Sequence, residues 1–390
     1  MCNTYPSQEV IERTEEFHEY VVTIGLLAAS NHTILNYAKN VDAIFASKVC
    51  EKLLTQAREI MKKDLYIAEE VRPALLPADT EPPEDLAIPP NYPLPSTTFL
   101  FPICQVSSSA LELVKLAETG LDYAAASKQL CSARMFHTVR NIFSLWCAVT
   151  PTYHREALES LPQVAALAHN SAMYLAHRLV TLGFSYREKL AGQPTLVDLV
   201  PMVREVGTDM LLTSMRLQRD KLKQMLATAG FPGLAVDKRL SSGAEQGMRQ
   251  VLHSLAHLQK VWGGVLPTGT YLRCQGTLLN TVMEELILII TNLEDISADA
   301  GGQLVSLLNQ LVTKSPALFA PEEASRYTKR WAKFREVIGV LGATLREIEE
   351  RWGAAAGPLA KEVPAEQVKQ LVRALFQNTE RRAALLAKIK

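Results

Sequence analysis

The stretch from Leu278 to Leu293, LLNTVMEELILIITNL, constrains the fold more than any other part of the sequence. A β-strand is excluded, because the run is too long and does not alternate between apolar and polar residues. A membrane-spanning helix is excluded, because Glu284 and Glu285 interrupt an apolar run that is far shorter than a bilayer requires. The apolar residues recur every three to four positions, which predicts a core helix with one broad stripe that other helices must cover. The stripe consists of Leu278, Leu279, Val282, Met283, Leu286, Ile287, Ile289, Ile290 and Leu293.

Helical periodicity of the same kind continues through most of the chain, and no strand pattern is longer than a few residues. Nine prolines lie between Pro73 and Pro102. Proline cannot donate a helix hydrogen bond and restricts the residue before it, so this stretch predicts a linker. We expect a helical hairpin over residues 1–66, a Pro-rich linker over 67–104, a helical bundle over 105–265 and a C-terminal helical bundle over 266–390. The predicted fold is all-α, an elongated stack of antiparallel helix bundles.

Several helix limits can be predicted from single residues. The second helix of the hairpin should run to about Lys63 with a break near Ser47, and Pro151 should start a short turn. Residues 331–352 have helical spacing throughout. Ser297 should cap one helix, and either Asn378 or Thr379 should cap the last one.

Charge and cysteine usage exclude some classes of function. The 41 Lys and Arg residues balance the 41 Asp and Glu residues, so the chain has no overall positive field with which to bind nucleic acid. Residues 1–10 do not resemble a secretory signal. The six cysteines contain no CxxC pair, which favours a reducing cytosol and thiols that act as small core residues.

Metal-dependent catalysis is an alternative that the sequence supports only weakly. His253 and His257 are four positions apart on a predicted helix and could face one ion, but Ser254 stands where a metalloprotease has glutamate. Acidic residues at 294, 295 and 299 could supply further ligands. The glycines at 264 and 269 have phosphate-loop spacing without the following lysine, so we interpret that segment as a helix connection. We expect no enzyme activity, no cofactor and no resident metal, with a helical metal-dependent enzyme as the alternative.

The C-terminal segment 365–390 is basic and amphipathic. It contains six basic side chains and two acidic ones, together with apolar residues at helical spacing. Such a helix pair either packs on its own bundle or binds a partner. A membrane-surface role is a further alternative. It is disfavoured because the segment contains no tryptophan, a residue typical of helices that lie at a membrane interface. The candidate partner-binding residues are Arg373, Phe376, Gln377, Asn378, Arg381 and Arg382.

Five stretches resemble a known family. They are NYAKNVDAIFASKVC at 36–50, VTPTYHREALESLPQVAALAHNSAMYLAHRLVTLG at 149–183, MRQVLHSLAHL at 248–258, GTLLNTVMEEL with ITNLEDIS at 276–297, and the terminal LVRALFQNTERRAALLAKIK. From about residue 10 onward the chain resembles the Zeste-white ten family of kinetochore and vesicle-tethering subunits, which belongs to the Dsl-type tethering class. The family's N-terminal coiled-coil half has no counterpart here, so the chain resembles the C-terminal half.

The resemblance implies a non-enzymatic scaffold with two sets of protein partners. At the kinetochore and spindle it implies the Rough-deal and Zwilch subunits, the spindle checkpoint and recruitment of dynein–dynactin. In the cytoplasm and at the endoplasmic reticulum (ER) it implies a related solenoid subunit, a RINT-type subunit and an ER syntaxin, which tether Golgi-derived vesicles. Contact with membrane would then be peripheral and made through partners, and nucleic acid would not be bound directly.

Overall fold

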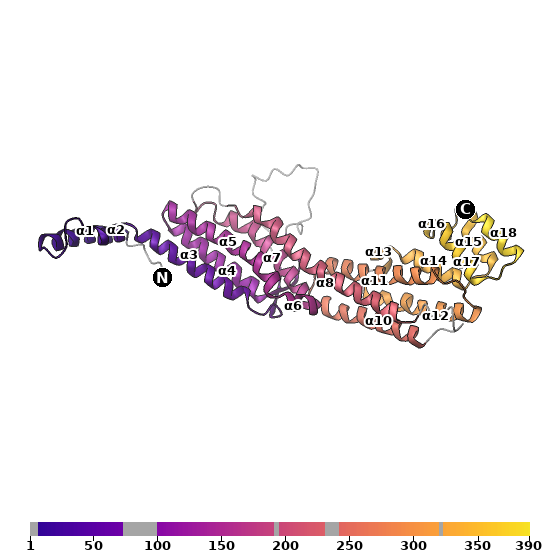
Figure 1. Ribbon diagram of the computed structural model, residues 1–390. Helices are drawn as coiled ribbons and strands as arrows, with labels where there is room; N and C mark the ends of the chain where they lie inside the picture. The colour runs from indigo at the N-terminus through magenta and orange to yellow at the C-terminus, as the bar shows by residue number, and fades with distance from the viewer. Residues whose placement is uncertain (1–6, 73–99, 191–194, 231–241, 320–322) are drawn as a thin grey trace, which may run out of the picture. The chain divides into compact units, whose positions relative to one another are not determined.

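The computed structural model describes residues 7–72, 100–190, 195–230, 242–319 and 323–390, and these residues are mostly helical (Figure 1). The only strands among them are β1 (Ala68–Val71) and β2 (Cys104–Ser107), which form a two-stranded sheet. The prediction of an all-α fold is therefore confirmed. The two strands lie at the ends of the predicted linker, whose proline-rich middle, residues 73–99, falls outside the described residues.

The described chain forms two compact units that interleave in sequence. The described residues within 1–101, 106–157 and 167–210 form unit 1, and those within 102–105, 158–166 and 211–390 form unit 2. The first helices are α1 (Ser7–Thr23), α2 (Thr33–Lys39), α3 (Val41–Met61), α4 (Ser108–Ala126), α5 (Gln129–Tyr153), α6 (Arg155–Ser160) and α7 (Pro162–Ser185). The one-turn η1 (Val197–Leu199) leads into α8 (Val200–Thr228), which contributes residues to both units. The predicted boundary at 265/266 thus lies inside unit 2.

Unit 2 continues with shorter helices toward the C-terminus. They are α10 (Ser242–Trp262), α11 (Thr268–Thr291), α12 (Ala298–Lys314), η3 (Ser315–Leu318), α13 (Ala324–Tyr327), α14 (Trp331–Leu341), α15 (Leu345–Trp352), η4 (Gly353–Ala355), α16 (Pro358–Glu362), α17 (Ala365–Leu375) and α18 (Glu380–Lys388). None of the helices among the described residues combines the length and apolarity needed to cross a bilayer.

The core of unit 1 forms where α3, α4 and α5 pack against one another. Leu53, Leu113 and Phe143 are buried there, one from each helix. Gly120 lets α4 approach closely, because a Cβ at this position would lie 2.6 Å from Cγ2 of Val139 on α5. Apolar faces that the sequence places on three separate helices therefore meet in one core.

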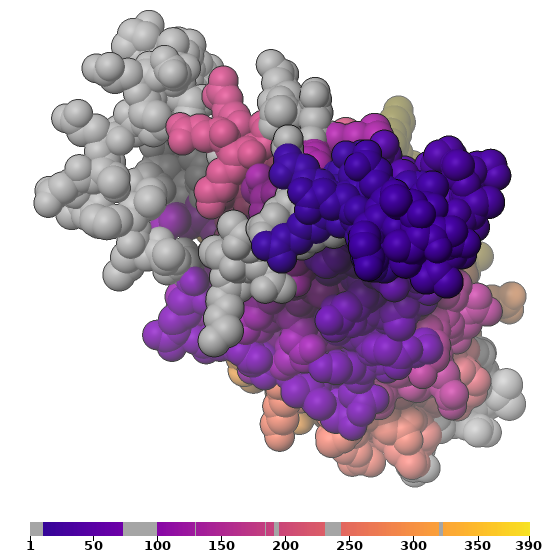
Figure 2. Space-filling view, turned by 90° about the vertical axis from the view of Figure 1, so that its left-hand side faces the viewer, coloured from indigo at the N-terminus to yellow at the C-terminus, as the bar shows by residue number. Residues whose placement is uncertain are grey.

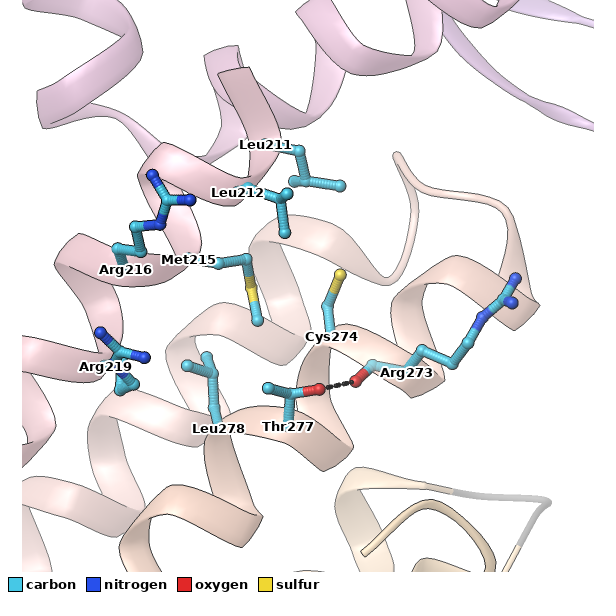
Figure 3. Close-up of a pocket in the computed structure, with 9 residues that line it drawn as sticks. All are labelled: Leu211, Leu212, Met215, Arg216, Arg219, Arg273, Cys274, Thr277 and Leu278. Atoms are coloured by element: carbon cyan, nitrogen blue, oxygen red, sulfur yellow. Dashed lines mark hydrogen bonds between the residues drawn. The ribbon is translucent and has the colours of Figure 1, made fainter. Parts of the chain in front are cut away.

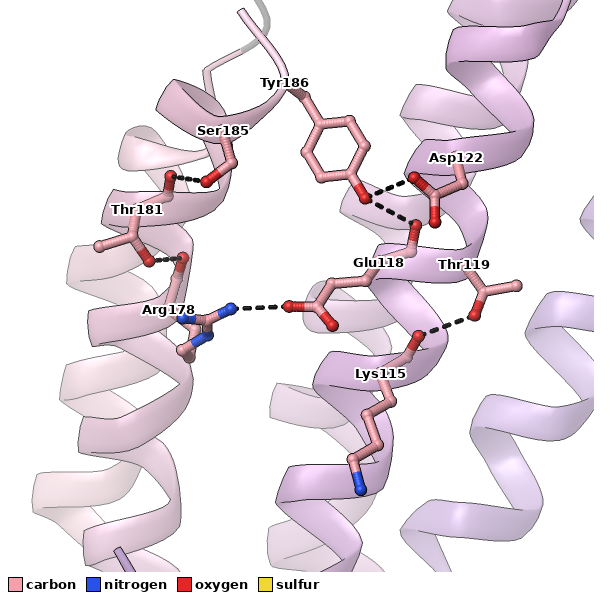
Figure 4. Close-up of polar contacts among 8 residues, drawn as sticks. All are labelled: Lys115, Glu118, Thr119, Asp122, Arg178, Thr181, Ser185 and Tyr186. Atoms are coloured by element: carbon pink, nitrogen blue, oxygen red, sulfur yellow. Dashed lines mark hydrogen bonds and ion pairs between the residues drawn. The ribbon is translucent and has the colours of Figure 1, made fainter. Parts of the chain in front are cut away.

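Polar contacts join α4 to α7 and to Tyr186, the residue that follows α7, in the same unit (Figure 4). Arg178 Nη2 donates to Glu118 Oε1 at 2.6 Å, and the Tyr186 hydroxyl donates to Asp122 Oδ1 at 2.7 Å. Burial and the Asp122 hydrogen bond raise the pKa of Tyr186. The tyrosine stays protonated and acts as a structural donor.

Another close helix approach in unit 1 involves the first part of α8. A Cβ at Gly207 would lie 2.2 Å from the Cβ of Ala172 on α7. The ring nitrogen Nδ1 of His169 lies 3.1 Å from the Gly207 carbonyl oxygen. Burial lowers the pKa of His169 and outweighs the opposing effect of that hydrogen bond, so the neutral ring is favoured.

The predicted core helix of unit 2 is α11, and its stripe is buried as expected. Leu278, Val282 and Leu286 are fully buried, whereas Leu288, on the other side, is 53% exposed. Ile289 belongs to the predicted stripe but is only half-buried. Trp262 at the end of α10 is also buried, and its Nε1 donates to the Pro162 carbonyl oxygen at 3.0 Å.

Two predicted helix limits are wrong. The hairpin helix breaks at Asn40, between α2 and α3, and continues through Ser47. Pro151 lies inside α5, which runs two residues further, so its ring removes one backbone amide donor without ending the helix there. The Thr152 hydroxyl donates to the nearby Ala148 carbonyl oxygen at 2.8 Å.

Residues 331–352, whose apolar residues have helical spacing, form two helices. The chain leaves α14 at Gly342, and Thr344 begins α15 with a capping box in which the Thr344 side chain and Glu347 bond each other's backbone amides. Such a box starts a new helix locally, even though the apolar spacing runs on across the break.

Candidate interaction surface

The last two helices of unit 2 form a corner that contains all six predicted partner-binding residues. Helix α17 ends at Leu375 with Phe376 as its C-cap, and α18 begins after Thr379, whose hydroxyl oxygen accepts from the Arg382 amide at 3.3 Å. Thr379 is therefore the cap of the last helix, and Asn378 lies in the turn before it. We call residues 373–382 the C-terminal corner.

Arg382 has a structural role at this corner. Its Nη1 donates to the Phe376 carbonyl oxygen at 2.7 Å and to the Arg373 carbonyl oxygen at 3.3 Å. These oxygens lie at the end of α17, where a cation also complements the helix dipole. Both Arg382 and Phe376 are half-buried, so they hold the corner together and offer little free surface.

The other four predicted residues are exposed: Arg373, Gln377, Asn378 and Arg381. Two further cations of the segment are already paired, because Lys369 contacts Glu366 at 3.1 Å and Lys388 forms an ion pair with Glu349 on α15. The guanidinium groups of Arg373 and Arg381 have no acidic partner among the described residues. The outer rim of the corner is thus open to solvent, and its two exposed arginines outnumber its exposed acidic residue, Glu380.

The apolar face of the same helices is occupied internally. Val368, Leu371 and Leu385 are buried in unit 2, and the Ile296 amide donates to the Ala374 carbonyl oxygen at 2.9 Å. The segment therefore docks on its own bundle, which was one of the two possibilities drawn from the sequence. A membrane-surface role would need this apolar face to be free.

The candidate metal ligands do not come together. His253, His257, Glu294, Asp295 and Asp299 are all exposed. Within the part of the chain that the structure describes, no group of three or more His, Cys, Asp or Glu residues could hold a metal ion. Gly264 lies between α10 and α11, and Gly269 lies in the first turn of α11, where the sequence predicted a helix connection.

One surface feature was missed by the sequence reasoning. A groove of about 340 Å³ lies between α11 and the unit 2 part of α8 (Figure 3). Leu212 and Met215 project from α8 toward Cys274 and Leu278 on α11, and Leu212 is 44% exposed. Burial raises the pKa of the Cys274 thiol to about 11, so the sulfur is not a nucleophile at neutral pH. No spacing in the sequence could reveal the groove, because its sides come from helices far apart in the chain.

Three family models together match most of the chain. Residues 3–61 match the model described as "Centromere/kinetochore protein zw10, middle domain", residues 99–224 match "Centromere/kinetochore protein zw10, C-terminal", and residues 246–389 match "ZW10 C-terminal helical domain".

Curated relatives agree with these models. The chain is similar to "Centromere/kinetochore protein zw10 homolog" of Rattus norvegicus, with 39% identity over 98% of this chain and 54% of the relative. The Mus musculus homolog is 38% identical over 98% of this chain and 54% of its own length. "Centromere/kinetochore protein zw10" of Drosophila melanogaster is 29% identical over 99% of this chain and 50% of the relative. The chain thus spans about half the length of the curated relatives it matches.

A solved structure described as "Apo structure of Myo2-GTD" is also similar, with a TM-score of 0.45 and 13% identity over 89% of this chain and 84% of that one. A likeness this distant carries no argument about function. The three consecutive family models and the identity to the rodent relatives establish the family. The chain belongs to the family of the centromere/kinetochore protein zw10.

Proposed function

We propose that this chain is a non-enzymatic scaffold subunit of a kinetochore complex, which works by presenting helix surfaces to protein partners. The observation that carries the proposal is the family membership, which extends over residues of both compact units. The curated relatives are named as centromere and kinetochore proteins. The packing of unit 2 is compatible with this role, because its helices bury their apolar faces and leave charged rims outside.

We further propose two sets of protein partners, which the resemblance to the Zeste-white ten family implies. In mitosis the chain joins the Rough-deal and Zwilch subunits, supports the spindle checkpoint and recruits dynein–dynactin. In interphase it joins the ER solenoid and RINT-type subunits beside an ER syntaxin, and takes part in Golgi-to-ER transport. The membrane contact is peripheral in this proposal.

The contact surface that we assign to these partners is the outer rim of the C-terminal corner. Arg373 and Arg381 are exposed and lack acidic partners among the described residues, so they are available to carboxylates of another protein. Phe376 and Arg382 fix the turn that presents them.

The test uses charge reversal, because deletion of residues 365–390 would remove buried core residues such as Leu371 and Val372 and damage unit 2. Arg373→Glu/Arg381→Glu should reduce capture of the purified Rough-deal subunit or ER solenoid subunit, most strongly at low salt. The matched control is Lys329→Glu/Arg335→Glu, which reverses two exposed charges elsewhere in unit 2. Circular dichroism establishes that both variants are folded.

Two results would contradict the proposal at different levels. If the corner variant and the control variant both capture the two partners as well as the unaltered chain does, the outer rim of the C-terminal corner is not the contact surface. Failure of the unaltered chain to capture either subunit, together with no enrichment of the tagged chain at mitotic kinetochores, rejects the scaffold function.

A further inference from the structure

Exposed large apolar side chains concentrate near the N-terminal end of the described chain. Seven of the seventeen such residues lie between positions 17 and 45. Three belong to α1 and its immediate continuation: Phe17 is 55% exposed, Tyr20 63% and Ile24 48%. Figure 2 shows the indigo N-terminal segment that carries these residues. Exposed apolar residues grouped in this way mark sites of interaction more often than isolated ones do.

These three residues form one line along the helix, which we call the α1 stripe. Their spacing is i, i+3 and i+7, and the Ile24 amide still donates to the Tyr20 carbonyl oxygen at 3.1 Å, so the helical geometry includes Ile24. The packed side of α1 is a different one. His18 and Val21 are buried, and the ring of His18 lies 5.6 Å from the ring of His32, next to α2. At roughly 100° per residue, the α1 stripe lies about a quarter turn away from that packed side.

An acidic line flanks the α1 stripe on its other side. Glu12, Glu16 and Glu19 have the spacing i, i+4 and i+7, and all three are exposed. Their carboxylates form no ion pair with any residue that the structure describes. Glu15, by contrast, pairs with Lys39 of α2 at 3.2 Å and so belongs to the contact between the two helices. An apolar seam with a charged flank is the arrangement by which amphipathic helices select a partner of opposite charge.

We propose that the α1 stripe binds an amphipathic helix of a partner protein whose flanks are basic. The partner's apolar residues would cover Phe17, Tyr20 and Ile24, and its Lys or Arg side chains would reach Glu12, Glu16 and Glu19. A second copy of this chain fits less well, because it would place one acidic line against another. An anionic membrane surface would be repelled by the same carboxylates.

This surface belongs to unit 1, so it is independent of the C-terminal corner and of the partners assigned to that corner. The probe is a fluorescent synthetic helix of about four heptads, with Leu at the seam positions and Lys at the flanking e and g positions. The full chain should bind it at low salt, as measured by fluorescence anisotropy. A second probe, with Glu in place of Lys, should bind much more weakly.

Two sets of substitutions separate the apolar from the charged contribution. Phe17→Ser/Tyr20→Ser should weaken binding by at least about tenfold, since buried aromatic residues dominate interfaces of this kind. Phe17→Leu/Tyr20→Leu should retain most of the affinity. Glu12→Gln/Glu16→Gln/Glu19→Gln should weaken binding and flatten its salt dependence.

Matched controls use other exposed positions of unit 1. Leu130 is 84% exposed, so Leu130→Ser removes apolar surface outside the stripe, and Glu205→Gln/Asp209→Asn removes carboxylates elsewhere. Both controls should bind the probe as the unaltered chain does, and thermal unfolding should show every variant folded.

The proposal is overturned if the Glu-flanked probe binds as tightly as the Lys-flanked one, or if neither the Ser nor the Gln variant changes the affinity. It is also overturned if the Ser variant abolishes a dimer seen by analytical ultracentrifugation, which would make a second copy the occupant. Binding of anionic vesicles that the Ser variant abolishes would identify a lipid surface and reject the protein partner.

Discussion

Gly276 provides a sharp test of how unit 2 is packed. It lies in α11 opposite α13, and a Cβ at this position would be 2.4 Å from the carbonyl oxygen of Tyr327 and 2.7 Å from its Cβ. Ordinary contacts begin near 3.4 Å, so Gly276→Ala requires α13 to move away by about 1 Å. Both neighbouring atoms lie on or next to the backbone, and no side-chain rotation can relieve the overlap.

The expected change in the free energy of unfolding follows from two opposing effects. Forcing an extra carbon into a packed site costs about 1–3 kcal/mol, and replacing glycine with alanine inside a helix returns about 1 kcal/mol. Because backbone atoms form the obstacle, the packing cost should lie toward the upper end. We therefore expect Gly276→Ala to lower the free energy of unfolding by about 1–2 kcal/mol.

The matched substitution is Gly302→Ala on α12, where an added Cβ would meet nothing within 4 Å. It should raise the free energy of unfolding, by up to about 1 kcal/mol. Urea denaturation gives both changes, and hydrogen exchange of α11 amides reports unit 2 separately from unit 1. A Gly276→Ala protein as stable as the unaltered chain would refute the close approach of α11 and α13.

Three further predictions concern other parts of the fold. Ile287 on α11 is 4% exposed, so Ile287→Ala should lower the free energy of unfolding by about 2–5 kcal/mol in the same urea experiment; a change below about 1 kcal/mol would show that the site is not packed. Thr344→Ala removes one half of the capping box of α15 and should cost about 1 kcal/mol by thermal unfolding, whereas Thr344→Ser should restore most of it. Burial holds the pKa of His169 below its ordinary 6.5, so the unfolded chain takes up this proton first as pH falls. Stability is then complete above about pH 6.5 and decreases below it, and His169→Gln should reduce that slope in urea titrations at several pH values; an unchanged slope would contradict a buried neutral ring.

The C-terminal helices show how far a local pattern can be interpreted. Their basic and apolar faces were evident in the sequence, and so was a cap at Asn378 or Thr379. Whether the apolar face binds its own bundle or a partner was not evident. The burial of Leu371 and Leu385 decides for the bundle, because that outcome depends on which faces unit 2 leaves uncovered. The exposed arginines then remain as the candidate contact surface.

Other features could not be predicted from the sequence, for identifiable physical reasons. Apolar spacing continues across Gly342, so the break between α14 and α15 depends on the capping hydrogen bonds of Thr344 and Glu347. Pro151 was predicted to start a turn, but it lies in the last turn of α5, where the loss of its single amide donor does not stop the helix from running to Tyr153. The groove between α8 and α11 depends on two helices whose pairing has no local signal.

Helix periodicity and capping depend on residues three or four positions apart, so the helical class, the core helix α11 and the cap at Ser297 could be predicted from the sequence, whereas the cap of the last helix was narrowed only to Asn378 or Thr379. The folded structure was needed to show which helices meet at Gly207 and Gly276, how Arg382 closes the C-terminal corner, and which apolar faces stay exposed on α1. Those features depend on contacts between residues distant in the chain, where a single Cβ or guanidinium group either fits its neighbour or does not.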